Sequence, residues 1–474
     1  MDGTSITLHD MQLIIFCFIS LILNQAYGNS MAPSPTFTDL LSEKMQKDPF
    51  SLIAMCLFLG AIFHTFLTSK LSNIAKQMET NLGHASWKSS VLKLLGEVEI
   101  VFALWLIPLS LCFVYFKGWA ATVHYFETRQ YAEPIFVIAI MSVASSRPIL
   151  KLAERTLRFI VHHCGGEKPS TWWICILTIT PLLGSLITEP AAMTIAALLL
   201  SQRVFCYQAK PSFLYASLGL LFVNVSVGGV LTNFAAPPIL MVASHWQWSS
   251  SFVFKKFGIS AMLGIVCATL FYAILFYKQL KQLNKNAQQS TGTRAEESDV
   301  PSFITVCHIL FLAWMVLNSH HIPLLIWGFL AFIVFTQLTS QTPVNVRNPM
   351  LVGCFLAGLV THGGLQMWWI DSILSHLNEQ LLFVGSVFLT SFNDNASITY
   401  LASLVSHFEN NWTLQHAIVS GAVVGGGLTV IANAPNPAGQ NLLSKFFPEA
   451  SVKPLPLFLG ALIPTCLMAI AFLL

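Results

Sequence analysis

Two apolar stretches, each interrupted by a carboxylate, decide the fold of this chain: GSLITEPAAMTIAALLL at residues 184–200 and LTSFNDNASITYLASL at residues 389–404. The interrupting residues are Thr188, Glu189 and Pro190 in the first stretch and Asn393, Asp394 and Asn395 in the second. Each stretch lies in a longer segment of similar composition, and we name these segments unit one (residues 184–238) and unit two (residues 386–440). The chain therefore contains two similar, polar-interrupted hydrophobic units.

Composition places these units in a membrane. The chain has 474 residues, of which 55% are hydrophobic and 9% charged, whereas an ordinary soluble domain carries about 25% charged residues. Apolar runs near the roughly 20 residues that cross a bilayer recur along the whole length. Runs such as Ser251–Tyr277 do not alternate as the strands of a membrane barrel do. We predict an all-α, polytopic membrane helix bundle.

Apolar spans and one hydrophilic linker organise the chain. The predicted spans are Ser51–Thr68, Val98–Phe116, Glu133–Val143, Trp172–Ile187, Ser212–Leu231, Ser251–Tyr277, Phe303–Leu317, Ile322–Phe335, Leu351–Val360, Leu381–Thr390, Ala417–Ile431 and Leu455–Leu474. The linker, residues 278–300, is polar enough to predict an exposed, partly disordered loop. It separates a first transport half (50–277) from a second (301–474), and an N-terminal segment (1–49) precedes both.

The N-terminal segment contains an apolar stretch at residues 12–27 that is followed by small residues. This pattern is typical of a signal peptide, but no Lys or Arg precedes the stretch. A short first membrane helix, or a start at Met11, would account for it equally well.

Positive charge predicts the orientation of the units. Lys and Arg residues follow the first and third spans and fill the linker, which places all three loops in the cytoplasm. Simple crossings would put the linker outside, whereas a re-entrant hairpin over Trp172–Leu200 puts it inside. Five further crossings then make unit two enter from the opposite face. We therefore predict two inverted repeats, each with a re-entrant hairpin and a broken helix. The alternative is that the two units resemble each other by hydrophobic composition alone.

Aligned residues link the two units further. Glu189 corresponds to Asp394, and downstream the run GGVLTNFAAPPILMV at 228–242 corresponds to GGGLTVIANAPNPAGQNLL at 425–443. Glycine and proline break helices, and the freed backbone groups need protein, water or an ion as partners because lipid offers none. The predicted helix-break residues are Pro190, Gly228, Gly229, Pro237, Pro238, Gly425, Gly426, Gly427, Pro435 and Pro437. Broken helix ends aim partial charges at one place, so a binding site is expected where the breaks meet.

Glu189 and Asp394 are the central candidates for that site. A carboxylate at membrane depth is rare unless it faces a partner, water or an ion, and a proton and a cation compete for the same oxygens. The predicted ion- and proton-binding residues are Glu189, Asp394, Thr188, Asn393, Asn395, Thr232, Asn233, Thr429, Asn433 and Asn436. The simpler roles are a hairpin tip at the interface for Glu189 and a helix N-cap for Asp394.

Other polar residues are weaker candidates for the binding site. Glu97 and Glu99 begin the span at Val98, where an interfacial position is favoured over a place on an ion path. His64 is expected to be a packing residue. No metal site is predicted, because the histidine and cysteine clusters have no ligand partners at metal spacing.

The motifs TEPAAMT, GGVLTNFAAPP, FNDNASIT and GGGLTVIANAPNPAG together resemble the sodium/proton antiporter family of the ion transporter superfamily. Its relatives include bacterial sodium/proton antiporters, arsenite permeases and dicarboxylate/sodium symporters. The string GEVEIVFALWLIPL at 96–109 is similar to an early segment of that family, and the resemblance covers about residues 50–474. It implies two re-entrant hairpins and two broken helices around one transport site, and a homodimer. The acidic residue in each hairpin departs from the dicarboxylate symporters, whose hairpins carry a Ser-Asn-Thr pattern.

These observations predict a secondary active transporter that exchanges sodium, or another monovalent cation, for protons. The alternatives are a sodium-coupled anion symporter or an arsenite-type exporter and, less well supported, an intramembrane enzyme, for which the sequence shows no catalytic motif. We expect a bacterial inner membrane, or an organelle of bacterial origin, as the location. The expected partners are membrane lipids, the cation and the proton, with no organic cofactor and no nucleic acid.

Overall fold

The computed structural model describes residues 37–474 except residues 85, 290–299, 340–342 and 376. The predicted signal or membrane segment at residues 12–27 lies outside the described residues. Over the described ranges every regular element is helical. The α-helices are α2 (Phe37–Lys47), α3 (Pro49–Leu82), α4 (Trp87–Leu95), α5 (Val101–Lys117), α6 (Trp119–Glu127), α7 (Ala132–Ala144), α8 (Arg147–His163), α9 (Pro169–Ile187), α10 (Glu189–Arg203), α11 (Pro211–Gly228), α12 (Pro237–Ala243), α13 (Ser250–Val253), α14 (Ile259–Leu275), α15 (Tyr277–Gln289), α16 (Ser302–Leu317), α17 (Ile322–Leu338), α18 (Arg347–Gly363), α19 (Met367–Leu374), α20 (Glu379–Thr390), α21 (Asn395–Ser403), α22 (Trp412–Gly425), α23 (Asn436–Leu443) and α24 (Pro454–Leu473).

Several of these helices match a bilayer in length and composition. In the part of the chain that the structure describes, seven are long and apolar enough to cross a membrane. The number rises to nine if two bent pairs each count as one span: α7 with α8, bent by 63°, and α18 with α19, bent by 84°. The predicted polytopic, all-α membrane bundle is therefore confirmed.

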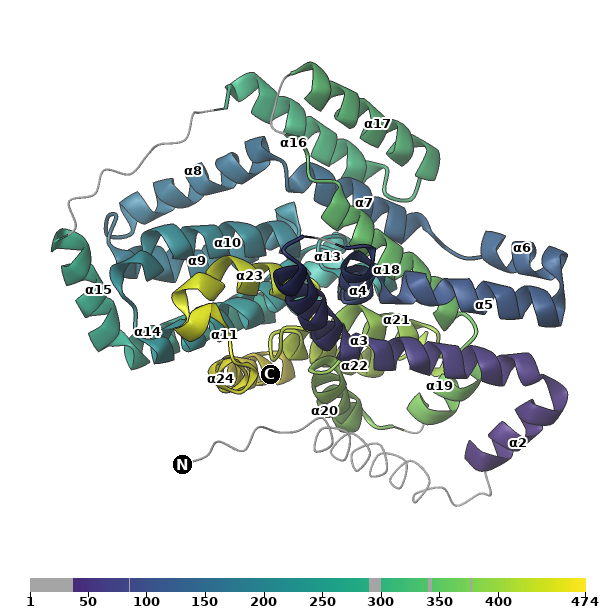
Figure 1. The fold of residues 1–474 in the computed structure, drawn as a ribbon. Coiled ribbons are helices and arrows are strands. Elements are labelled where there is room, and N and C mark those ends of the chain that lie inside the picture. The colour runs from purple at the N-terminus through teal and green to yellow at the C-terminus, as the bar shows by residue number, and fades with distance from the viewer. Residues whose placement is uncertain (1–36, 85, 290–299, 340–342, 376) are drawn as a thin grey trace.

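Apolar side chains form two main cores. The larger core lies among α9, α10, α11, α14, α22 and α24. The second core lies among α3, α5, α7, α16, α17 and α18, and Figure 1 shows α16 and α17 side by side above α7. Helices α12 and α21 place side chains such as Met241 and Tyr400 in the second core. The second core is therefore contacted by the segment at the end of unit one and by α21 within unit two.

Two expectations about segments were wrong. The loop expected after the first span is in part helix, because α3 continues to Leu82 and carries Lys70 and Lys76. The first part of the linker belongs to α15 (Tyr277–Gln289), where Leu280 and Leu283 share a buried face, and residues 290–299 of the linker lie outside the described residues. The predicted span Ala417–Ile431 is broken as the sequence predicts, because its regular helix ends at Gly425, where the consecutive glycines begin. The span Ser251–Tyr277 is close to the prediction but contains a π-helical turn, η4 (Phe254–Gly258).

Prolines inside membrane helices leave carbonyl groups without their usual donors, and neighbouring helices supply replacements. Pro181 removes the donor for Leu177 O, which instead accepts from Asn224 Nδ2 on α11 at 2.7 Å. Pro464 does the same to Gly460 O, which accepts from the Tyr272 hydroxyl on α14 at 2.8 Å. Kinked helices are thus tied to the larger core by side-chain bonds.

Loss of one such bond has a measurable cost. We expect Tyr272→Phe to destabilise the folded protein by about 1 kcal/mol, because Gly460 O then lacks its donor while packing is kept. Thermal unfolding in detergent is the measurement. Tyr115→Phe is the control, since Tyr115 is 83% exposed, and an equal effect of both changes would contradict the assignment.

An ion pair fixes the ends of two helices on one side of the second core. Lys117, the last residue of α5, donates to Asp48 Oδ1 at 2.7 Å just before α3 begins. Burial acts to raise the pKa of Asp48, but the hydrogen bonds from Lys117 and Ser51 outweigh it and the pKa is lowered. Helices α3 and α5 therefore run in opposite directions with this junction in common.

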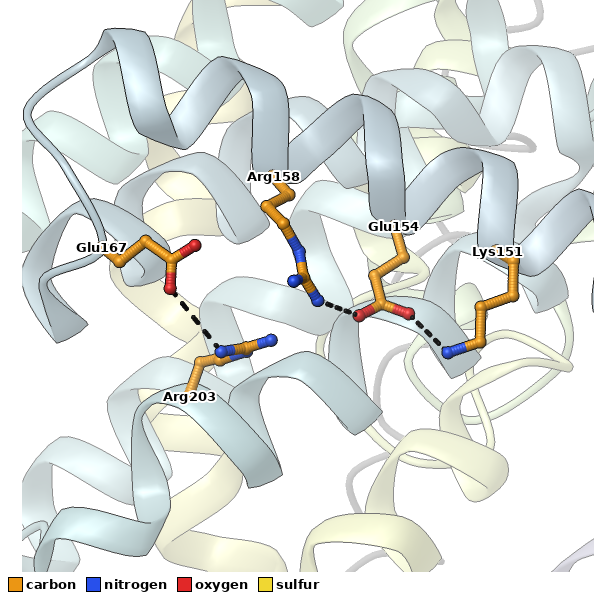
Figure 2. A network of polar contacts seen from close by, with 5 residues as sticks. All are labelled: Lys151, Glu154, Arg158, Glu167 and Arg203. Atoms are coloured by element: carbon orange, nitrogen blue, oxygen red, sulfur yellow. Dashed lines mark hydrogen bonds and ion pairs between the residues drawn. The ribbon is translucent and has the colours of Figure 1, made fainter. Parts of the chain in front are cut away.

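Basic residues expected in a cytoplasmic loop lie on the amphipathic helix α8. Figure 2 shows Glu154 between Lys151 and Arg158, with distances of 3.2 and 3.1 Å. Beside them Glu167 faces Arg203 at 3.9 Å, and the Arg203 guanidinium lies 4.9 Å from the Trp172 ring. These contacts join the end of α10 to the start of α9, at the opposite end of the hairpin from Glu189.

Candidate functional site

The interrupted stretch of each unit forms a turn between two helices. In unit one, α9 and α10 pack against each other, and Thr188 between them takes a positive φ of 74° that reverses the chain. In unit two, α20 and α21 have 12 and 9 residues, which at 1.5 Å per residue is short of the roughly 30 Å hydrocarbon core. The length of α20 and α21 fits a re-entrant path, whereas α9 is long enough to cross. Re-entrance of both hairpins stays a prediction.

The downstream runs break the chain as expected. Helix α11 leads into the short turn η3 (Gly229–Leu231), and regular structure resumes with α12 at Pro237. Helix α22 ends at Gly425, and α23 begins at Asn436 after the N-cap Pro435. Thr232 Oγ1 donates to Ser185 O at 2.8 Å, and the aligned Thr429 Oγ1 donates to Ser391 O at 2.7 Å. In each unit, the threonine hydroxyl therefore links the broken helix to the helix that precedes the turn.

Aligned glycines bring each break close to its turn. A Cβ on Gly229 would lie 2.6 Å from Glu189 Oε1. A Cβ on Gly426 would lie 2.8 Å from Asn395 Nδ2. Both distances are shorter than a side chain allows, so only glycine lets the backbone approach the polar tips this closely.

Helices of each unit also pack against helices of the other unit. Helix α10 of unit one packs on α23 of unit two, and α21 of unit two packs on α12 of unit one. This reciprocal packing places the four helices that start at a turn or a break around one region. It is the arrangement that a two-fold relation between the units would produce, and the inverted orientation of the repeats stays a prediction.

Glu189 lies where the two units contact each other. Its side chain is completely buried within the protein, and the alternative of a hairpin tip at the interface stays open. Oε2 accepts a hydrogen bond from Asn433 Nδ2 of unit two at 2.8 Å. Oε1 has no hydrogen-bond partner among the described residues. Glu189 thus ties one unit to the other through half of its carboxylate and leaves the other oxygen available.

Asp394 caps a helix and also lines a cavity. Its Oδ1 accepts from Ala396 N at 2.9 Å, which confirms Asp394 as the N-cap of α21. The backbone N–H of Ser397 donates to the main-chain carbonyl of Asp394 at 3.1 Å. Asn393 Oδ1 accepts from Asp394 N at 3.0 Å and so supports the turn. The N-terminus of α21 and the bond from Ala396 N therefore hold this carboxylate in position.

Buried oxygens without hydrogen-bond donors gather on these elements. Within the described ranges the residues with such an atom include Thr188, Glu189, Asn395, Ser397, Asn433 and Asn436. Five of the six were predicted as binding residues from the sequence, and Ser397 was not. Buried acceptors are normally satisfied, and oxygen acceptors are the ligands of hard cations. The region therefore has the chemistry of a cation site.

The remaining predicted residues have structural partners. Asn436 Nδ2 donates to Gly426 O and Thr429 O, at 2.9 and 2.8 Å, so it satisfies carbonyls that the break frees. Asn395 Nδ2 faces Ser226 Oγ on α11 at 3.5 Å. The structure does not bring Asn233 to the carboxylates by a hydrogen bond, because its amide binds Trp248 O and the Ser250 hydroxyl.

A small cavity beside Asp394 is also lined by Glu99, which the sequence did not predict as a binding residue. It has a volume of about 20 Å³, which is enough for one water-sized body. Its lining residues are Val98, Glu99, Val352, Phe355, Asp394, Val430, Ile431, Asn433, Ala434 and Pro437. Glu99 therefore faces the predicted site, and its interfacial placement stays a prediction. His64 is a packing residue as expected, since its ring nitrogens contact Leu95 O and Trp105 Nε1.

Comparison with known families agrees with this geometry. The model of the family described as "Putative Na+/H+ antiporter" matches residues 49–474. The chain belongs to this family. No curated protein matches it. Membership, together with the apolar helices, makes the chain an integral membrane protein and a cation and proton transporter rather than an enzyme. The family match includes both units and the segment that carries Glu99.

Proposed function

We propose that the protein exchanges sodium, or a similar monovalent cation, for protons at a site built on Glu189 and Asp394. The observation that supports this most directly is the bond from Asn433 to Glu189. It places the carboxylate of one unit on the break of the other, beside buried oxygens that have no donor in the described part of the chain. A cation would bind these oxygens, and protons would compete for the two carboxylates.

The same geometry favours a cation over an anion. Anion transporters of broken-helix type direct helix N-termini at the substrate. Here the N-terminus of α21 already binds Asp394 through Ala396 N, and the first turn of α10 carries Glu189. Internal carboxylates therefore occupy the positions that an anionic substrate such as a dicarboxylate would need, and they would repel it.

Transport by reconstituted protein tests the proposal. We expect an outward sodium gradient to acidify the lumen of proteoliposomes that contain a pH-sensitive dye, because sodium leaving the lumen brings protons in. Lithium, potassium and calcium, each used in turn, define the cation. Empty liposomes are the control. Absence of cation-dependent proton movement, together with counterflow of arsenite or a dicarboxylate, would overturn the proposal in favour of an anion transporter.

Location and assembly follow as further parts of the proposal. We infer a bacterial inner membrane, or an organelle of bacterial origin, and a homodimer in that membrane. Cross-linking in native membranes and the mass of the detergent-solubilised protein are the measurements for the dimer. The transported species are the cation and the proton, and no organic cofactor is required.

A further inference from the structure

The cavity beside Asp394 lies where the two cores meet. Val98, Glu99, Val352 and Phe355 belong to η1 (Val98–Ile100) and α18 and form one wall. Asp394 and residues 430–437 of unit two form the other wall. The cavity therefore separates two carboxylates that come from different parts of the fold.

A third polar group faces the same cavity. Asn433 is 1% exposed, and its Oδ1 lacks a hydrogen-bond partner within the residues described. Its Nδ2 donates to Glu189, which fixes the direction of the amide. A buried acceptor held in place by a bond on its other side is a group prepared for a donor or a cation.

Glu99 and Asp394 are the two acidic residues that line the cavity. Glu97, on the same turn, forms an ion pair with Arg347 at the start of α18. Arg347 and Glu97 both act electrostatically on Glu99, with opposite signs. Glu99 in turn repels the Asp394 carboxylate. Apart from Asn433, the other side chains that line the cavity are apolar, so few polar groups offset the repulsion between these carboxylates.

We propose that Glu99, Asp394 and Asn433 Oδ1 form a second cation subsite, distinct from the contact between Glu189 and Asn433. A single dehydrated monovalent cation fits a cavity of about 20 Å³. Two carboxylates that line one cavity repel each other, and a bound cation or proton relieves that repulsion. The subsite thus holds either one cation or one proton, and Asn433 connects it to Glu189. This inference rests on the proposed cation/proton exchange.

Steady-state transport by Glu99→Gln tests the subsite. We expect the KM for sodium to rise by about tenfold or more while kcat changes little, because the variant loses a charged ligand in the cavity and keeps the side-chain shape. The dependence of KM on pH should flatten, since one competing proton site is lost. Glu99→Asp should recover part of the affinity. Glu127→Gln, on the exposed end of α6, is the matched control.

Proton release provides a second readout that needs no transport. Sodium added to weakly buffered, detergent-solubilised protein should displace protons, and Glu99→Gln should displace fewer protons per sodium bound. An unchanged KM, pH profile and proton release in Glu99→Gln would overturn the subsite while the exchange activity of the unaltered protein still stood. Failure of the unaltered protein to move protons with any cation would instead overturn the proposed function.

Discussion

Exchange should fall by about 100-fold or more in both Glu189→Gln and Asp394→Asn. Each change removes a buried negative charge that would balance the cation, and loss of a charged partner in such surroundings costs about 3 kcal/mol, which is about 100-fold at 1.36 kcal/mol per tenfold. Sodium-driven proton movement in proteoliposomes is the measurement. Both carboxylates are buried, with Glu189 at 0% and Asp394 at 7% exposure.

Both substitutions keep the local fold, so a loss of transport reports on the charge. Asparagine is a good N-cap and can accept the bond from Ala396 N that Asp394 accepts now. Glutamine can still accept from Asn433 Nδ2. Glu379→Gln, on the exposed first turn of α20, removes a charge from the same hairpin and should leave exchange unchanged. Wild-type exchange in both site variants would contradict the proposed role of the carboxylates.

The largest structural effects are expected at aligned glycines in the two broken helices. Gly228 on α11 lies against the backbone of Pro181 on α9, and a Cβ there would overlap the carbonyl of that residue. A Cβ on Gly425 would lie 2.6 Å from Val387 O on α20. Because backbone atoms cannot rotate away, the helices would have to separate. We expect Gly228→Ala and Gly425→Ala each to destabilise the protein by about 3 kcal/mol.

Gly385→Ala provides the matched control in the same hairpin. Apart from the backbone of α20 itself, no atom of the described residues lies within 4 Å of a Cβ built on Gly385. Alanine in a helix is favoured over glycine by roughly 1 kcal/mol, so this variant should be as stable as the parent or slightly more stable. Thermal unfolding followed by size-exclusion chromatography ranks the three variants. Equal stability of Gly385→Ala and Gly425→Ala would show that the close approach is not required.

The sequence predicted the breaks well because their chemistry is local. Glycine and proline end helices wherever they lie, so the interruptions at Thr188 and at Gly425 could be placed without a structure. Alignment of the units also paired Thr232 with Thr429, and these residues make equivalent bonds. The linker was less predictable, because the two leucines that bury one face of α15 need a partner surface that composition does not show.

Partners across the units could not be predicted in the same way. Asn433 aligns with Ala236 and not with another asparagine, so internal similarity gave no reason to join it to Glu189. Glu99 stands at the start of a span, where an interfacial position is the usual expectation. Its place on the cavity depends on how η1 and α18 pack against unit two.

The sequence by itself therefore determined that the chain is a helical membrane protein with two carboxylate-bearing interruptions. Hydrophobic length and helix-breaking residues depend on near neighbours in the chain, and they leave a clear pattern there. Only the tertiary structure decided that Glu189 binds Asn433, that Asn233 binds the loop after α12, and that Glu99 faces Asp394. These contacts join residues far apart in sequence, and they depend on the close approach of backbones at glycines and on the packing of two cores.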